Sequence, residues 1–178
     1  MSAPLSASPE ASGYDLHTAD GLWLRWFTAP PLAGPETVVA TGVFDLLHVG
    51  HVRFLRAARA AGRQLVVGIE DDERTRVRKG AGRPFQSVEE RCELVASLWP
   101  VDAVFAISGS PEVAPIPGYR ELLAPLAPAR LAFTAGDPAA AGRRAVAAAL
   151  GAGVVEIPYV PHRSTTAIIA SLALSRSG

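Results

Sequence analysis

The sequence predicts an α/β fold, namely a Rossmann-like, doubly wound parallel sheet of five strands with helices on both faces. Short apolar segments alternate with amphipathic helical segments along residues 37–178. The segment 64–70 is apolar almost throughout, as strands buried on both faces are. The segments rich in glycine, histidine or clustered charge each follow a predicted strand. They should therefore meet at the carboxyl edge of the sheet, where such folds bind ligands.

The predicted elements follow from where apolar residues recur. Strands are expected over residues 38–41, 64–70, 101–107, 130–134 and 154–157. Helices are expected over residues 50–61, 87–97, 119–124 and 139–150, with a last helix beginning at Ser164. Ser87 and Glu90 have the spacing of a capping box, which supports a helix beginning there.

Residues 71–84 form a charged stretch that is expected to be a loop. In this interpretation its arginines at 74, 76 and 78 lie in solvent, and the loop closes over the substrates as a lid. Lys79 lies within it and is the one lysine in a chain with sixteen arginines. Because arginine replaces lysine nearly everywhere else, we expect Lys79 to stand where a compact ammonium group is needed.

The N-terminal residues 1–36 are rich in Pro, Ser, Ala and Gly and are predicted to be a partly flexible extension of the 37–178 domain. Within them, the aromatic segment 21–27 is expected to form a short strand or extended piece. This segment would cover the domain or contact a partner chain.

Composition excludes several classes of function. The chain has 17 basic and 17 acidic residues, so its net charge of zero disfavours general binding of nucleic acid. It has neither a long apolar run nor a secretion signal, which predicts a cytoplasmic protein without membrane contact. The single cysteine, Cys92, is expected to be a small buried apolar residue.

The segment His48-Val-Gly-His51 lies where a predicted strand turns into a helix. The start of a helix presents backbone N–H groups and a partial positive charge, which suit a phosphate group. Two imidazoles at this place would both hold a phosphate and stabilise charge that develops on it. The alternative is a pair of structural histidines near a helix end. Asp45, in the same turn, is expected to be structural.

Residues 41–51, Thr-Gly-Val-Phe-Asp-Leu-Leu-His-Val-Gly-His, resemble the signature of the cytidylyltransferase-like nucleotidyltransferases. That group includes glycerol-3-phosphate and phosphocholine cytidylyltransferases and heptose-phosphate adenylyltransferases. The resemblance extends from Val38 to about Ser171. Residues 79–84, followed by Glu90 and Arg91, are most similar to the heptose-phosphate enzymes. Gly-Asp at 136–137 and Ser-Thr-Thr at 164–166 are also shared with members of the group.

The resemblance implies transfer of a nucleoside monophosphate from CTP or ATP to a small sugar phosphate, polyol phosphate or phosphonate, with release of pyrophosphate. It implies catalytic roles for His48, His51 and Lys79, and contact of Arg91 with the acceptor phosphate. The implied nucleotide-binding residues are Thr41, Gly42, Val43, Phe44, Gly50, Gly136, Asp137, Arg163, Ser164, Thr165 and Thr166. Mg²⁺ is expected to accompany the triphosphate, and the relatives imply a homodimer.

Some alternatives stay open. The heptose-phosphate enzymes usually carry Lys-Gly-Gly-Asp where residues 134–137 read Thr-Ala-Gly-Asp, so the base and the acceptor are both undetermined. A non-catalytic nucleotide-binding or regulatory module of the same fold is the second functional hypothesis. Arg91 could also be a solvated helix residue. Relatives of aminoacyl-tRNA synthetases share the His-x-Gly-His turn, but this chain is too short for an anticodon-reading domain.

Overall fold

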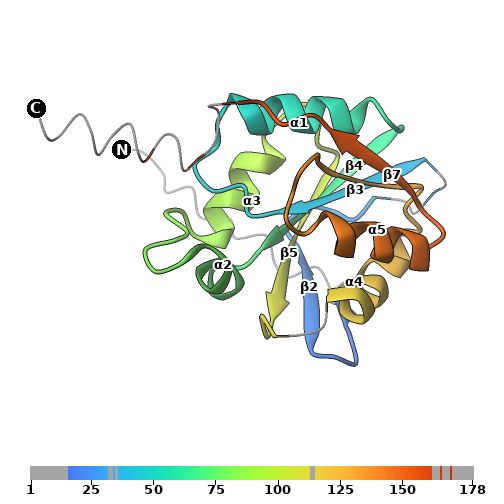
Figure 1. Cartoon of the computed structure of the whole chain (residues 1–178), viewed down its shortest axis with the longest axis horizontal. Helices are drawn as coiled ribbons and strands as arrows, with labels where there is room; N and C mark the ends of the chain where they lie inside the picture. The colour runs from blue at the N-terminus through green and yellow to red at the C-terminus, as the bar shows by residue number, and fades with distance from the viewer. Residues whose placement is uncertain are drawn as a thin grey trace, which may run out of the picture.

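Seven strands form one sheet in the part of the chain that the computed structural model describes, which is residues 16–31, 34, 36–112, 115–161, 165 and 169. The strand order is β1-β2-β5-β4-β3-β6-β7. The five predicted strands are present and parallel to their neighbours among themselves (Figure 1), which confirms the fold class. They are β3 (Thr37–Gly42), β4 (Gln64–Glu70), β5 (Ala103–Gly109), β6 (Arg130–Thr134) and β7 (Gly153–Ile157).

The predicted number of five strands is corrected to seven, because the N-terminal stretch adds β1 (Leu16–His17) and β2 (Leu22–Trp26) to the sheet. β2 pairs antiparallel with β5, with Trp23 opposite Ser108. Leu22 and Leu24 are buried in the apolar core, and burial of their side chains stabilises the pairing of β2 with the sheet. The short strand expected over residues 21–27 is thus confirmed. It lies on the domain as an edge extension of the sheet.

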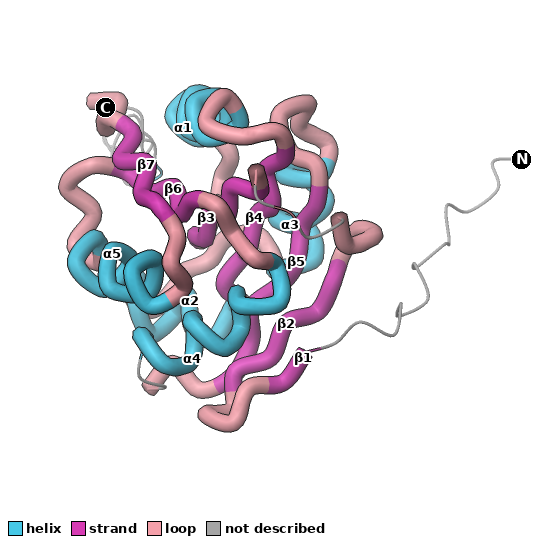
Figure 2. The backbone as a smooth tube through the Cα atoms, turned by 90° about the vertical axis from the view of Figure 1, so that its right-hand side faces the viewer, coloured by secondary structure: helices cyan, strands magenta, loops and turns pink. Residues whose placement is uncertain are grey.

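Helices cover both faces of the sheet (Figures 1 and 2). One face packs against α1 (Val49–Arg59) and α3 (Val88–Ala96), and the other packs against α4 (Pro115–Leu123) and α5 (Ala140–Ala149). Neighbouring strand residues point to opposite faces, so Val38 belongs to the core under α1 and Val39 to the core under α5. The sheet is therefore apolar on both sides, as expected for buried parallel strands.

The charged stretch 71–84 is not a loop throughout, because it contains α2 (Asp72–Lys79). The Asp71 carboxylate accepts a hydrogen bond from the Arg74 backbone N–H at 2.8 Å and caps the helix. Acidic residues occupy the first turn and basic residues the last, which stabilises the helix dipole. Arg74 was predicted to lie in solvent but is 1% exposed. Its Nε donates to Glu70 at 2.6 Å, which balances the buried charge.

The remaining helix boundaries differ little from the prediction. The capping box of Ser87 and Glu90 is present at the start of α3, and Cys92 in this helix is buried, which raises the pKa of its thiol to about 12. The helix expected at residue 119 begins at Pro115, since prolines need no N–H partner in the first turn of a helix. Most of the helix expected from Ser164 lies outside the described residues.

Candidate active site

A tight turn connects β3 to α1 and carries the two histidines. Phe44 and Leu46 adopt positive φ angles of 53° and 50°, which reverse the chain after Gly42. His48 is the N-cap of α1 in an extended conformation, and no side chain of the described residues caps the helix there. The first-turn N–H groups therefore have no capping side chain, and the helix start has the arrangement that favours an anion.

His48 and His51 stack on one another, with ring centroids 3.8 Å apart and an interplanar angle of 20°. Phe44 packs against His51 at 5.3 Å between centroids and holds it from the side. Nδ1 of each histidine is buried and has no hydrogen-bond partner among the described residues. A buried polar atom without a partner costs about 1–3 kcal/mol, so the pair is poorly explained as a purely structural feature.

Both imidazoles are held in the neutral form. Burial lowers the pKa of His48 below its ordinary value of 6.5. Burial and the neighbouring His48 lower the pKa of His51 to about 3, although Asp45 acts in the opposite direction. Neutral imidazoles are able to donate a hydrogen bond to phosphate oxygens, and a bound polyphosphate would raise their pKa values by its negative charge.

These pKa values predict that the protein loses stability in weak acid. Between pH 6.5 and about 3 the unfolded chain binds a proton at His51 while the folded chain does not, so the free energy of unfolding falls as the pH falls. The lowered pKa of His48 acts in the same direction. Urea unfolding at about pH 7 and about pH 5 measures this change. His51→Asn should make it smaller. A nuclear magnetic resonance titration giving His51 an ordinary pKa would contradict the prediction.

Asp45 joins three segments beside this turn. Its carboxylate accepts hydrogen bonds from Arg83 Nε at 2.8 Å and from the Phe85 and Gln86 backbone N–H groups at 3.0 and 3.1 Å. Its backbone oxygen accepts from the Thr165 hydroxyl at 2.6 Å. The side chain of Asp45 is fully buried. The structural interpretation of Asp45 is therefore confirmed, and Thr165, a predicted nucleotide-binding residue, is brought to the histidine turn.

Arg91 lies in the interior with 0% exposure, which corrects both the expected contact with an acceptor phosphate and the alternative of a solvated residue. Its Nη1 donates to the backbone oxygens of Val43 at 2.7 Å and Glu70 at 2.8 Å. Its Nε donates to Gln86 O at 3.0 Å, and Nη2 pairs with Asp72. The guanidinium group thus connects the turn after β3 to the end of β4.

Lys79 is the last residue of α2 and is exposed to solvent. Gly80 and Gly82 follow with φ angles of 93° and 82°, a conformation that few other residues adopt. The ammonium group is thus presented at a helix end next to a glycine-rich connection.

The turns after β3 and β6 lie side by side, since these two strands are paired. Arg143 of α5 connects them, because its Nη1 donates to Thr41 O at 2.8 Å and its Nη2 lies 3.4 Å from Asp137. Asp137 also accepts a hydrogen bond from the Ala139 N–H at 2.8 Å. Gly136 has a φ of 78° and open space at its Cβ position. The predicted nucleotide-binding residues Thr41, Gly136 and Asp137 are thus neighbours.

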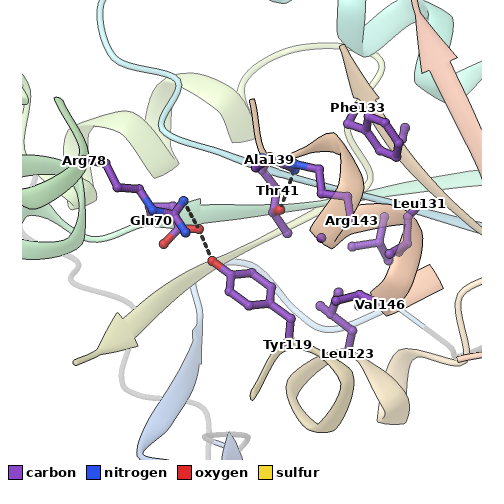
Figure 3. A pocket seen from close by; sticks show the side chains of 13 residues that line it. Thr41, Glu70, Arg78, Tyr119, Leu123, Leu131, Phe133, Ala139, Arg143 and Val146 are labelled. Carbon is purple, nitrogen blue, oxygen red and sulfur yellow. Dashed lines mark hydrogen bonds and ion pairs between the residues drawn. The ribbon is translucent and has the colours of Figure 1, made fainter. Parts of the chain in front are cut away.

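A cavity of about 290 Å³ opens beside these turns, between the sheet and helices α4 and α5 (Figure 3). Glu70, Arg78 and Tyr119 form one wall, and Thr41 and Arg143 lie at another. The Glu70 carboxylate accepts a hydrogen bond from the Tyr119 hydroxyl, and burial raises the pKa of Tyr119 above its ordinary value. The cavity thus lies on the face of the sheet that α4 and α5 cover, opposite the face that packs against α1.

Four polar residues of this cavity were not expected from the sequence, namely Glu70, Arg78, Tyr119 and Arg143. One signal was present for Glu70, which is a charged residue at the end of an otherwise apolar strand. Arg143 lies in an alanine-rich helix, where nothing in the sequence says which face its side chain takes. Of the predicted residues, Gly50 lies in the first turn of α1, while Arg163, Ser164 and Thr166 lie outside the described residues.

The described residues contain neither a metal-binding cluster nor a membrane-spanning helix. No group of three or more His, Cys, Asp or Glu side chains there is placed to hold a metal ion. None of the helices there is long and apolar enough to span a bilayer.

The sequence of this chain is similar to a known protein family and to several curated proteins. Residues 39–113 match the family model described as cytidylyltransferase-like. The bifunctional protein HldE of Shewanella loihica is 34% identical over 174 residues, which is 96% of this chain and 34% of the relative. HldE of Methylococcus capsulatus is 47% identical over 77 residues, which is 43% of this chain and 16% of the relative. The chain thus spans about a third or less of these curated relatives.

Structural comparison agrees with the sequence matches on the fold. The crystal structure of the lipopolysaccharide core biosynthesis protein from Thermoplasma volcanium superposes with a TM-score of 0.53 at 24% identity. The match covers 70% of this chain and 96% of the other. The structural match supports the fold, and the family model together with the His48-Val-Gly-His51 turn at the carboxyl end of β3 identifies residues 39–113 as a cytidylyltransferase-like region.

Proposed function

We propose that this protein transfers a nucleoside monophosphate from ATP or CTP to a small phosphate- or phosphonate-bearing acceptor. The observation that carries the proposal is the stacked pair His48 and His51 at a helix start without a capping side chain. Helix N–H groups suit the triphosphate, and neutral imidazoles suit the charge that develops at its α-phosphorus. Simple nucleotide binding would not need two imidazoles whose buried Nδ1 atoms lack partners among the described residues.

In the proposed reaction an oxygen of the acceptor phosphate attacks the α-phosphorus of the triphosphate. A new phosphorus–oxygen bond forms, the bond to the β-phosphate bridging oxygen breaks, and pyrophosphate leaves. Catalysis then consists of positioning and charge stabilisation. His48 and His51 would stabilise the negative charge that develops on the α-phosphate and on the leaving pyrophosphate. Lys79 would approach the phosphates by movement of the connection at Gly80, and Ser164, Thr165 and Thr166 would contact the β- and γ-phosphates.

The remaining ligands are assigned by chemistry. Mg²⁺ would arrive on the triphosphate, since phosphate oxygens are among its preferred ligands. The similarity to proteins named HldE supports a sugar phosphate as acceptor and ATP as donor. A homodimer remains the prediction from the resemblance, and a cytoplasmic location remains the prediction from composition.

A pyrophosphate-release assay tests the proposal directly. Each of the four ribonucleoside triphosphates is combined with sugar phosphates, polyol phosphates, phosphonates and FMN, in the presence of Mg²⁺. We expect release with ATP or CTP and a subset of acceptors, and no release without acceptor. Calorimetric titration with the same nucleotides provides the control. Tight nucleotide binding without release for any acceptor would favour the regulatory module instead.

A further inference from the structure

The connection between α2 and α3, residues 80–87, begins directly after Lys79 and projects from the domain (Figure 1). Lys79 and the three residues that follow it are all exposed to solvent. Gly80 and Gly82 have φ angles of 93° and 82°, and a Cβ atom at either position would meet nothing within 4 Å. Lys79 is thus carried by a segment whose backbone has both free space and conformational freedom.

Arg83, at the far end of these exposed residues, is held in the interior. Its side chain is 14% exposed, and its Nε donates to the fully buried Asp45 carboxylate at 2.8 Å. The same carboxylate accepts from the backbone N–H groups of Phe85 and Gln86 at 3.0 and 3.1 Å. Leu46, the next residue of the histidine turn, donates its backbone N–H to Gln86 Oε1 at 3.0 Å. From Arg83 onward the connection is therefore bound to the histidine turn.

Helix α2, at the other end of the exposed residues, is also fixed. Arg74 in this helix is 1% exposed and donates to Glu70 at 2.6 Å and to the backbone oxygen of Ser110 at 2.7 Å. Arg83 follows Lys79 by four residues, so their Cα atoms are at most about 14 Å apart, at up to about 3.6 Å per residue. The connection therefore confines Lys79 to the neighbourhood of the histidine turn.

We infer that Arg83 is a positioning residue for Lys79: through its ion pair with Asp45 it holds the connection against the histidine turn and directs the ammonium group to the phosphates bound there. The inference rests on the proposed function, in which Lys79 approaches these phosphates. A short tether keeps a flexible group at a high effective concentration near its target, and release of the tether lowers that concentration. The alternative is that Arg83 only neutralises the Asp45 carboxylate. The two differ in whether the effect of Arg83 depends on Lys79.

A double-mutant cycle of Arg83→Gln and Lys79→Met tests this dependence. With the best substrates, we expect Lys79→Met to lower kcat/KM about 10²-fold and Arg83→Gln to lower it at least about tenfold. In the Lys79→Met protein, Arg83→Gln should cause a further loss of no more than about threefold, because no ammonium group remains for it to position. A larger further loss, or a smaller effect of Arg83→Gln alone, overturns the inference.

Two more variants test whether the effect belongs to the contact with Asp45. Arg83 contacts this carboxylate through one nitrogen, so Arg83→Lys should keep kcat/KM within about threefold of the original protein. Arg76→Gln removes one positive charge from an exposed position of α2 and is the matched control, with an expected loss below about threefold. A larger loss in either variant contradicts the inference.

A variant that keeps Arg83 covers the case in which Arg83→Gln does not fold. Insertion of six glycines between Gly80 and Ala81 lengthens an exposed segment at a small cost in stability. The longer tether lowers the effective concentration of Lys79 by about fourfold. We therefore expect kcat/KM to fall at least about threefold in the original protein and to stay unchanged in the Lys79→Met protein. Any other pattern speaks against a positioning role.

The proposed function and this inference can fail separately. If no acceptor releases pyrophosphate, the proposed function fails, and calorimetric titration with inorganic triphosphate then decides the inference on the same four proteins of the cycle. Weaker binding by Lys79→Met and by Arg83→Gln, with no further loss in the double variant, supports it. Every other result, including absence of binding to the original protein, refutes it.

Discussion

Replacing His51 by alanine is expected to lower kcat for nucleotidyl transfer by about 10²–10³-fold, the usual loss when one donor to a transition-state oxyanion is removed. His51 stacks at 3.8 Å on His48 and is held by Phe44, so its ring has one defined position over the start of α1. The KM for the nucleoside triphosphate should change much less, because the helix N–H groups remain. Pyrophosphate release at saturating substrates measures the effect.

The fold should survive this substitution. His51→Ala removes packing against Phe44, but it also removes a buried Nδ1 atom that has no hydrogen-bond partner among the described residues. We expect the free energy of unfolding to change by about 1 kcal/mol or less. His17→Ala is the matched control, because His17 is exposed on the edge strand β1 and stacks on Trp23. Near-normal kcat in His51→Ala would refute the catalytic assignment.

Arg91→Met is expected to have the largest effect on stability. The substitution keeps much of the side-chain volume but removes the donors to the backbone oxygens of Val43, Glu70 and Gln86. It also leaves Asp72 without its buried partner. A buried acceptor left without its donor costs about 1–3 kcal/mol, and three are affected, so we expect a loss of about 3 kcal/mol, a large part of the stability of an ordinary domain. Urea unfolding followed by circular dichroism measures the change.

Arg53→Met provides the comparison on an exposed helix position, where we expect a change of about 0.5 kcal/mol or less. A second measurement separates positioning from direct contact with the acceptor. If Arg91 only positions the turn, Arg91→Met should lower kcat without selectively raising the KM for the acceptor. A stable Arg91→Met protein with a large rise in that KM alone would restore the contact with the acceptor phosphate that the sequence suggested.

The two N-terminal strands show one limit of analysing the sequence alone. The low-complexity composition of residues 1–36 indicated an extension, and the pattern Leu-Trp-Leu-Arg-Trp at 22–26 indicated a strand. No residue pattern around positions 22–26 indicated that this strand pairs with β5, which lies more than 75 positions further along the chain. That pairing depends on the apolar surface that β5 and α4 present to Leu22 and Leu24. Such a surface exists only once the sheet has formed.

The buried arginines show a second limit. Arg74 and Arg91 carry the same charge as the exposed arginines around them, and their positions on a helix do not distinguish them. They are buried because the interior carboxylate of Glu70, the half-buried carboxylate of Asp72 and backbone oxygens at strand ends are available to receive them. Since burial of a charge requires a partner, the partners decided which arginines lie inside.

The five parallel strands and the place of the histidine turn could be predicted from the sequence, whereas the order of the strands could not. Both depend on local signals, namely the alternation of apolar segments and the His48-Val-Gly-His51 spacing after a strand. Only the tertiary structure decided what surrounds that turn. Arg143 meets Thr41 across 102 residues, and Tyr119 meets Glu70 across 49. Contacts at such separations arise from how β3, β4 and β6 pack against α4 and α5, and they shape the cavity between the sheet and these helices.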